Sequence, residues 1–93
     1  MTTQAQSKER RNALRRELFE KLERGELDLP STLRMMRKIT GRTQPEYAKL
    51  VGVSARVLIE FERGQGNPTL ATLRKLLAPF GLDVVARAKP HTR

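Results

Sequence analysis

The side chains that could do chemistry in this chain are mostly cationic. Lysine and arginine number 19 against 10 acidic residues, and the formal net charge is +9. Residues 1–30 carry seven basic and six acidic side chains, whereas residues 31–93 carry twelve basic and four acidic ones. Such a positive field favours a polyanion, either nucleic acid or an anionic membrane. The alternative is a charge that serves only solubility.

Side chains for catalysis or metal binding are scarce. The absence of cysteine excludes a disulfide framework and a thiolate zinc site. The only histidine, His91, is the third residue from the C-terminus. Ser7, Ser31 and Ser54 each stand where a helix is expected to begin, so capping explains them without a nucleophilic role. We therefore expect no metal, no cofactor and no enzymatic activity.

The length and hydropathy pattern indicate one small soluble domain. The 93 residues allow a single domain with a small core. No apolar run approaches the ~18 residues of a membrane-spanning helix, and the N-terminal residues lack the apolar segment of a signal peptide. We expect a cytoplasmic protein without a membrane partner.

Residues 43–64 carry the pattern of two short helices joined by a tight turn. Thr43 and Glu46 form a T-x-x-E capping box at the start of the first helix. Gly52 can end that helix in the left-handed conformation, and Ser54 can cap the next one. Two helices joined in this way are typical of the helix-turn-helix, whose second helix enters the major groove of DNA.

Other helices are expected on both sides of this unit. Residues 8–24 favour a helix capped by Ser7, and residues 32–40 favour a second helix capped by Ser31. After the unit, residues 70–80 carry a broad apolar face through two helical segments interrupted at Pro79. These segments would close the core over the helix-turn-helix.

The first of these helices carries a narrow apolar stripe. Leu14, Leu18 and Leu22 recur every four residues, with Phe19 beside them. A lone helix of this length is marginal in water, so the stripe needs a surface to pack on. That surface belongs to the same domain, to a second copy of the chain, or to another protein, so the stripe is also a candidate partner-binding site.

The C-terminal residues change to the period-two alternation of a half-buried strand. A single strand on a helical domain has no partner in its own chain, and its unpaired edge favours pairing with a second copy. Residues 89–93 are expected to form a free basic tail. The strand expected to pair across a homodimer includes Leu82, Val84, Val85 and Ala86.

Residues 31–82 resemble the DNA-binding domain of the Cro and phage-repressor family, also called XRE. The resemblance implies an all-α, five-helix repressor-like fold, here with an extra N-terminal helix and the short C-terminal strand. The chain then divides into residues 1–30 (helix and linker), 31–81 (helix-turn-helix domain) and 82–93 (strand and tail). The matching positions are Thr43-Gln44, Ala48, Gly52-Val53-Ser54, Leu58, Glu62, Gly64 and Asn67-Pro68.

The resemblance also implies roles for individual residues. Arg37 is expected to form a structural ion pair with Glu62, since a half-buried carboxylate needs a fixed partner. Base contacts are expected from Ala55, Arg56 and Glu60, and the fork of Arg56 fits the O6 and N7 atoms of guanine. Phosphate contacts are expected from Arg42, Gln44, Lys49, Ser54, Arg63 and Gln65.

The combined reading is a homodimeric, sequence-specific DNA-binding regulator, a repressor of an inverted-repeat operator. The C-terminal strand also resembles that of HipB-like antitoxins, which implies a toxin protein as a further partner. The alternative is a protein-interaction module, or an antitoxin that acts mainly through its protein partner, with weak or no specific DNA binding. Ile59 and Glu60 favour this alternative, because many family members carry polar, basic or amide residues there.

Overall fold

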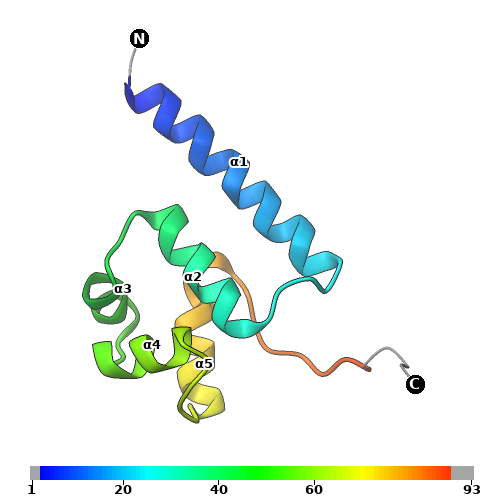
Figure 1. The fold of residues 1–93 in the computed structure, drawn as a ribbon, viewed down its shortest axis with the longest axis vertical. Coiled ribbons are helices and arrows are strands. Elements are labelled where there is room, and N and C mark those ends of the chain that lie inside the picture. Colours follow the sequence, from blue (N-terminus) through cyan, green and yellow to red (C-terminus); the bar gives the residue numbers. More distant parts are fainter. Residues whose placement is uncertain (1–2, 89–93) are drawn as a thin grey trace.

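The computed structural model describes the backbone of residues 3–88 and the side chains from residue 8 to residue 88. Every regular element in this range is a helix, which confirms the all-α prediction (Figure 1). The expected tail at residues 89–93, including His91, lies outside it. The elements are α1 (Thr3–Glu23), α2 (Leu29–Thr40), α3 (Gln44–Val51), α4 (Ala55–Glu62), α5 (Leu70–Leu77) and a 3₁₀ turn, η1 (Ala78–Phe80).

The first helix starts earlier than predicted. It begins at Thr3, so Ser7 lies inside it and does not cap it. No glycine or proline precedes position 25, and nothing therefore stops the helix from extending toward the N-terminus. Gly25, with a φ of 68°, turns the chain after the last helical residue.

The apolar stripe of α1 packs on the chain's own core. Leu18 is fully buried, and Leu14 and Leu22 pack against the same cluster. Only Phe19, with 37% of its surface exposed, stays open to solvent. The sequence left three surfaces on which the leucines could pack: the same domain, a second copy of the chain, or another protein. In the structure they pack on the same domain.

The N-terminal half of α1 projects beyond the domain (Figure 1). The radius of gyration is 14.5 Å, compared with about 12 Å for a compact chain of this length. The first buried residue of the helix is Leu18, and the described side chains before residue 14 are all exposed. The described charged side chains of the projecting half are therefore exposed to solvent.

The second helix is capped by Asp28, not by Ser31 as predicted. The Asp28 side chain accepts a hydrogen bond from the backbone N–H of Ser31 at 2.9 Å, which lowers the pKa of Asp28. Pro30 sits in the first turn, where its missing N–H costs nothing. The aspartate and the proline together move the start of α2 three residues toward the N-terminus.

The core lies where α2 to α5 converge under α1. Tyr47 is fully buried, and its hydroxyl donates a hydrogen bond of 2.7 Å to the carbonyl of Leu76. Burial raises the pKa of Tyr47 to about 12. The eleven buried apolar residues are Leu18, Leu33, Met36, Ile39, Tyr47, Ala48, Leu58, Phe61, Leu76, Leu77 and Phe80.

The prediction of a C-terminal strand is wrong over the described part of the chain. Residues 82–88 carry no regular secondary structure, because a strand needs a neighbour and this helical fold supplies none. Leu82 and Val84 pack against the core, whereas Val85 and Ala86 are exposed. The alternating apolar residues therefore arise because one side of an irregular segment packs against the core.

This segment is held by polar contacts with the rest of the domain. Asp83 pairs with Arg74 of α5 at 3.3 Å. Arg87 lies against Gly25, so closely that a Cβ at position 25 would collide with its guanidinium.

Within the described residues, no helix is both long and apolar enough to cross a membrane.

Candidate nucleic-acid interface

The helix-turn-helix is built by α3, the turn at residues 52–54 and α4. Gly52 adopts a φ of 80°, and its N–H donates to the carbonyl of Ala48 at 2.9 Å. The Ser54 hydroxyl accepts the N–H of Val57 at 3.1 Å, so it caps α4. At the start of α3 the predicted capping box forms, and the N–H of Thr43 lowers the pKa of Glu46. The local sequence therefore determines both helix starts.

An ion pair between Arg37 and Glu62 holds the C-terminal end of α4 against α2. The guanidinium makes two parallel hydrogen bonds to the carboxylate, from Nε to Oε2 at 2.9 Å and from Nη2 to Oε1 at 3.0 Å. Glu62 is only 4% exposed and Arg37 is 21% exposed. Two-point contact in a shielded setting fixes the orientation of α4 more firmly than a single bond would.

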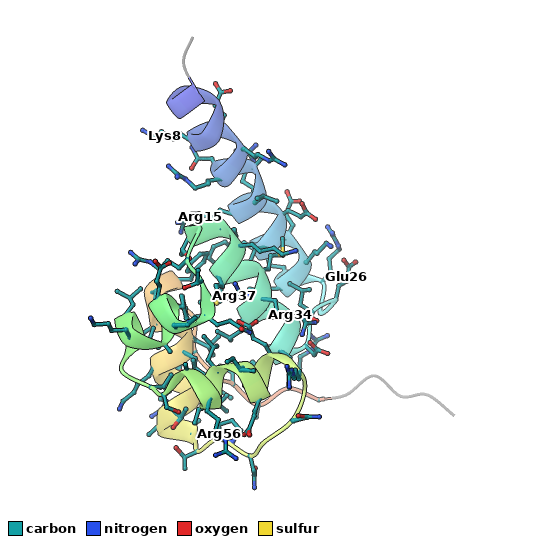
Figure 2. The ribbon with its side chains drawn as sticks, turned by 60° about the vertical axis from the view of Figure 1, so that its left-hand side comes forward. Lys8, Arg15, Glu26, Arg34, Arg37 and Arg56 are labelled. Carbon is teal, nitrogen blue, oxygen red and sulfur yellow. The ribbon has the colours of Figure 1, made fainter. Side chains whose placement is uncertain are left out.

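Two further side chains join this pair. Gln44, the first residue of α3, donates from Nε2 to Oε1 of Glu62 at 3.0 Å. Arg34, one turn before Arg37 on α2, donates to the backbone carbonyl of Glu62 and to the hydroxyl of Ser31. Figure 2 shows both arginines reaching from α2 toward the α4 side of the molecule. The network therefore connects α2, the start of α3 and the end of α4.

The expected base-reading residues of α4 differ in how far they are exposed on its outer face. Arg56, Glu60 and Arg63 fall within about 60° around the helix axis and share one face. Arg56 is 87% exposed and lies on the outside of the domain (Figure 2). Ala55 is about 100° away from Arg56 around the helix, and it packs partly on the core. Its methyl group is accordingly less available to a base than the Arg56 fork.

Two of these expected readers are bound to each other. The Nε atom of Arg56 lies 3.2 Å from Oε2 of Glu60, one turn later on α4. Glu60 is 40% exposed, so the pair stays in contact with water. The contact leaves both terminal nitrogens of Arg56 without a partner among the described side chains. Because the pair is exposed to water, the contact between the two side chains is a weak one.

The expected phosphate contacts divide into four groups. Arg42 and Gln44 lie at the start of α3, where the capping box already uses the backbone N–H groups of Thr43 and Glu46 and Pro45 has none. Arg63 and Gln65 lie exposed after α4, where the N–H of Gln65 donates to the carbonyl of Glu60 at 2.8 Å. Lys49 lies about 140° around α3 from Gln44, so the two cannot hold the same phosphate. Ser54 lies at the start of α4, where it is the N-cap residue.

Sequence reasoning missed Arg34 and the contact between Arg56 and Glu60. Both had a visible signal, since Arg34 and Arg37 are three residues apart on one helix and Arg56 and Glu60 are four apart. In the described part of the chain, no group of three histidine, cysteine or acidic residues could hold a metal ion.

Comparisons with known proteins point to the same elements. Residues 33–86 match the helix-turn-helix family, so α1 lies outside the matched region. An uncharacterized HTH-type transcriptional regulator of Haemophilus influenzae is 44% identical over 45 residues, or 48% of this chain and 46% of that protein. This chain therefore spans about half the length of that relative.

Two further relatives are more distant. The uncharacterized HTH-type transcriptional regulator YazB of Bacillus subtilis is 32% identical over 59 residues, which cover 63% of this chain and 86% of YazB. Antitoxin HipB of Escherichia coli is 32% identical over 56 residues, which cover 60% of this chain and 64% of HipB. No solved structure matches the chain.

Proposed function

The chain belongs to the helix-turn-helix family of XRE type, and from this premise we propose that it is a sequence-specific DNA-binding transcriptional regulator that represses its target. In this proposal α4 is the recognition helix and Arg56 reads a guanine through two hydrogen bonds in the major groove. Flanking phosphates are held by Arg42, Gln44, Ser54 and the residues after α4. The chain acts by binding and not as an enzyme.

The observation that carries the proposal is the network around Glu62. It holds α4 at a defined angle against α2 and α3, so the outer face of α4 is presented rigidly. The same network holds Gln44 in the first turn of α3, where we propose that its side chain also contacts a phosphate. A rigid reading face next to a phosphate clamp is what sequence-specific binding in the major groove requires.

We propose that Glu60 acts through Arg56 and does not itself contact a base. In the free protein it holds Nε of Arg56, which leaves the terminal nitrogens directed outward for guanine. In this proposal Arg56 is the main base-reading residue, and Ala55 contributes less.

The direct test is selection of bound duplexes from a random pool, followed by footprinting on the DNA upstream of the protein's own gene. The proposal expects one enriched motif, and Arg56→Ala is expected to lose the preference at one base pair. Equal affinity for the enriched and a scrambled duplex at physiological salt would refute specific regulation. A preference that survives in Arg56→Ala would refute the assigned reader.

We also propose that the chain binds an inverted repeat as a homodimer. A helix of eight residues is about 12 Å long, which is too short to read more than a few base pairs. Two copies with recognition helices about 34 Å apart would read successive major grooves and multiply the discrimination. Sedimentation with the enriched duplex should give two chains per duplex, whereas one chain per full site contradicts the dimer.

The likeness to antitoxin HipB favours a second role as an antitoxin that also binds a toxin protein. Co-expression with the neighbouring gene should then yield a stable complex. Because Leu18 is buried in the core, deletion of α1 would damage the fold and is a poor test. Substitution of the exposed Phe19 by serine is a milder probe of the surface that α1 leaves open.

A further inference from the structure

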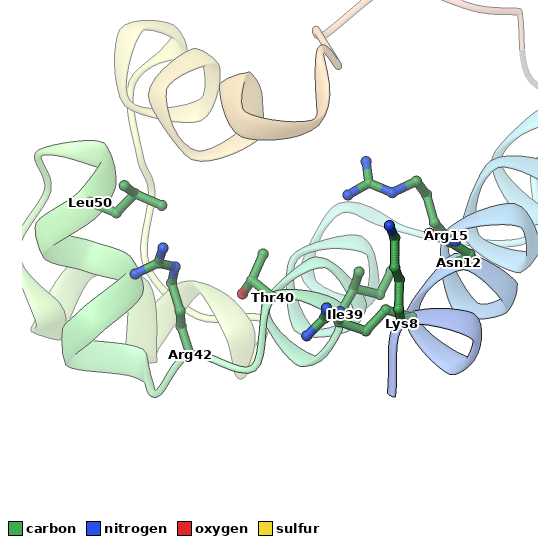
Figure 3. A pocket seen from close by; sticks show the side chains of 8 residues that line it. Lys8, Asn12, Arg15, Ile39, Thr40, Arg42 and Leu50 are labelled. Atoms are coloured by element: carbon green, nitrogen blue, oxygen red, sulfur yellow. The ribbon is translucent and has the colours of Figure 1, made fainter. Parts of the chain in front are cut away.

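A groove with basic walls separates the projecting half of α1 from the corner between α2 and α3. Its volume is about 400 Å³. Figure 3 shows Lys8 and Arg15 on the α1 side and Arg42 and Leu50 on the α3 side, with the end of α2 between them. The residues used below are Lys8, Arg11, Arg15, Thr40, Arg42 and Leu50, and we call this site the basic groove.

The cationic groups of the basic groove form no ion pair with the described residues of the chain. No carboxylate in the described part of the molecule lies within 4.0 Å of Lys8, Arg11, Arg15 or Arg42. Lys8, Arg11 and Arg15 fall within about 60° of one another around α1, so they form one face. Arg42 also attracts the carboxylate of Glu46, whose pKa it lowers, but it forms no ion pair with it. Four cations gathered around one hollow suit an anion with several charges.

One of these charges is held in place by packing. The guanidinium of Arg15 stacks over the ring of Phe80, 4.6 Å from its centre. This stacking retains the charge and limits the motion of the side chain. Thr40 cannot supply a free donor, because its hydroxyl already donates to the carbonyl of Arg37 at 2.7 Å. The basic groove therefore offers positive charge, with the apolar side chain of Leu50, which is 52% exposed, on its rim.

The basic groove is continuous with the proposed DNA interface through Arg42. This residue lines the groove and also belongs to the phosphate contacts expected at the start of α3. A duplex that lies on α4 and reaches Arg42 therefore arrives at the edge of the groove. Phosphates suit the charge of the groove, and a deoxyribose suits the exposed face of Leu50.

We propose that the basic groove binds the phosphate backbone of duplex DNA beside the base pairs read by α4. This proposal rests on the proposed function and deepens it. Lys8 and Arg11 would contact phosphates outside the recognised sequence, and Arg42 would link them to the contacts at the start of α3. The helix α1, which lies outside the region matched to the family, then lengthens the footprint without adding base specificity.

The test compares two double variants of the full chain with equal loss of charge. Lys8→Gln/Arg11→Gln removes two groove cations and leaves Arg15 on Phe80. Arg10→Gln/Arg16→Gln is the control, since both positions are exposed on α1 and lie more than about 100° from the centre of the groove face. Circular dichroism checks that both variants keep the helical fold.

Binding is measured by fluorescence anisotropy on the enriched duplex with long flanks, on the same duplex trimmed to the enriched motif, and on a random duplex. On the long duplex the groove variant should bind roughly tenfold more weakly than the control, and the slope of log affinity against log salt should fall by about two. On the trimmed duplex the two variants should bind alike.

The outcomes separate the two proposals. Equal affinity and equal salt slope of the two variants on the long duplex overturn the groove, although base reading by α4 then stands. Failure of selection to enrich any motif overturns specific reading, and because phosphate contacts carry no sequence information, the random duplex still tests the groove. If only binding to a protein partner is lost in the groove variant, the groove belongs to that partner and the DNA assignment is wrong.

Discussion

The recognition helix carries two glutamates two residues apart, and each is paired with an arginine in a different setting. Glu62 faces the core, is 4% exposed and receives two hydrogen bonds from Arg37 of another helix. Glu60 faces outward, is 40% exposed and receives one hydrogen bond from Arg56 of its own helix. One Arg–Glu pair therefore holds helices together, whereas the other lies on the surface proposed to read DNA.

The difference in burial decides what each pair can do. Breaking the shielded pair leaves a charge without water or a partner, which is costly, so the Arg37–Glu62 contact is expected to be kept while the domain is folded. Breaking the exposed pair costs little, because water replaces the lost contact. In the proposed complex Arg56 can therefore adjust its position toward a base without a large loss of stability, whereas Arg37 stays bound to Glu62.

Removal of the scaffolding carboxylate should have the largest effect. Glu62→Ala leaves Arg37 and Gln44 without their acceptor, and we expect a loss of about 3 kcal/mol in the free energy of unfolding. Urea denaturation followed by circular dichroism measures it. Glu60→Ala is the matched control and should lose no more than about 0.5 kcal/mol. Similar losses in the two variants would remove the distinction between the pairs.

Removal of the reading arginine should act on DNA and not on stability. Arg56→Ala should lose roughly 1–3 kcal/mol of discrimination at one base pair, with an unchanged urea midpoint because the side chain is exposed. Titration against the enriched duplex and its single-base variants measures the discrimination. Arg63→Ala is the control, and it should weaken binding to all of these duplexes alike.

A neutral contact in the scaffold provides an intermediate case. Tyr47→Phe removes the hydrogen bond to the carbonyl of Leu76 and should cost about 1 kcal/mol. The raised pKa of Tyr47, about 12, means that its contribution to stability is complete below pH ~10 and is lost as pH rises through the folded-state value. Tyr47 is the only tyrosine, so its absorbance reports the titration directly. A midpoint near 10 in the folded protein would contradict the buried contact.

The smallest effect is expected from neutralising the outer glutamate. Glu60→Gln removes a negative charge that faces phosphate, and DNA affinity at low salt should rise severalfold, the equivalent of roughly 0.2–1 kcal/mol. Stability should not change measurably. If affinity falls and the preference for the enriched motif weakens as well, Glu60 is needed to orient Arg56, and the positioning role outweighs the repulsion.

Several features of the fold were predictable because they depend on neighbouring residues. The caps at Thr43 and Ser54 and the turn at Gly52 follow from local backbone chemistry, and all three form. The start of α2 was harder to predict, because Asp28 and Ser31 both suit a cap and Pro30 between them is tolerated in a first turn. The C-terminal alternation misled, because a strand is defined by its neighbour and not by its own sequence.

The sequence by itself determined the helix-turn-helix, the sign of the charge and the residues available to read DNA, since caps, periodicity and composition are properties of short segments. Only the tertiary structure decided which charges are spent on the scaffold and which remain for a ligand. It placed Gln44 and Arg34 on Glu62, attached Arg56 to Glu60, and opened a groove between Arg42 and the cations of α1. The reason is physical: an ion pair depends on burial and distance, and both arise only when segments remote in sequence are packed together.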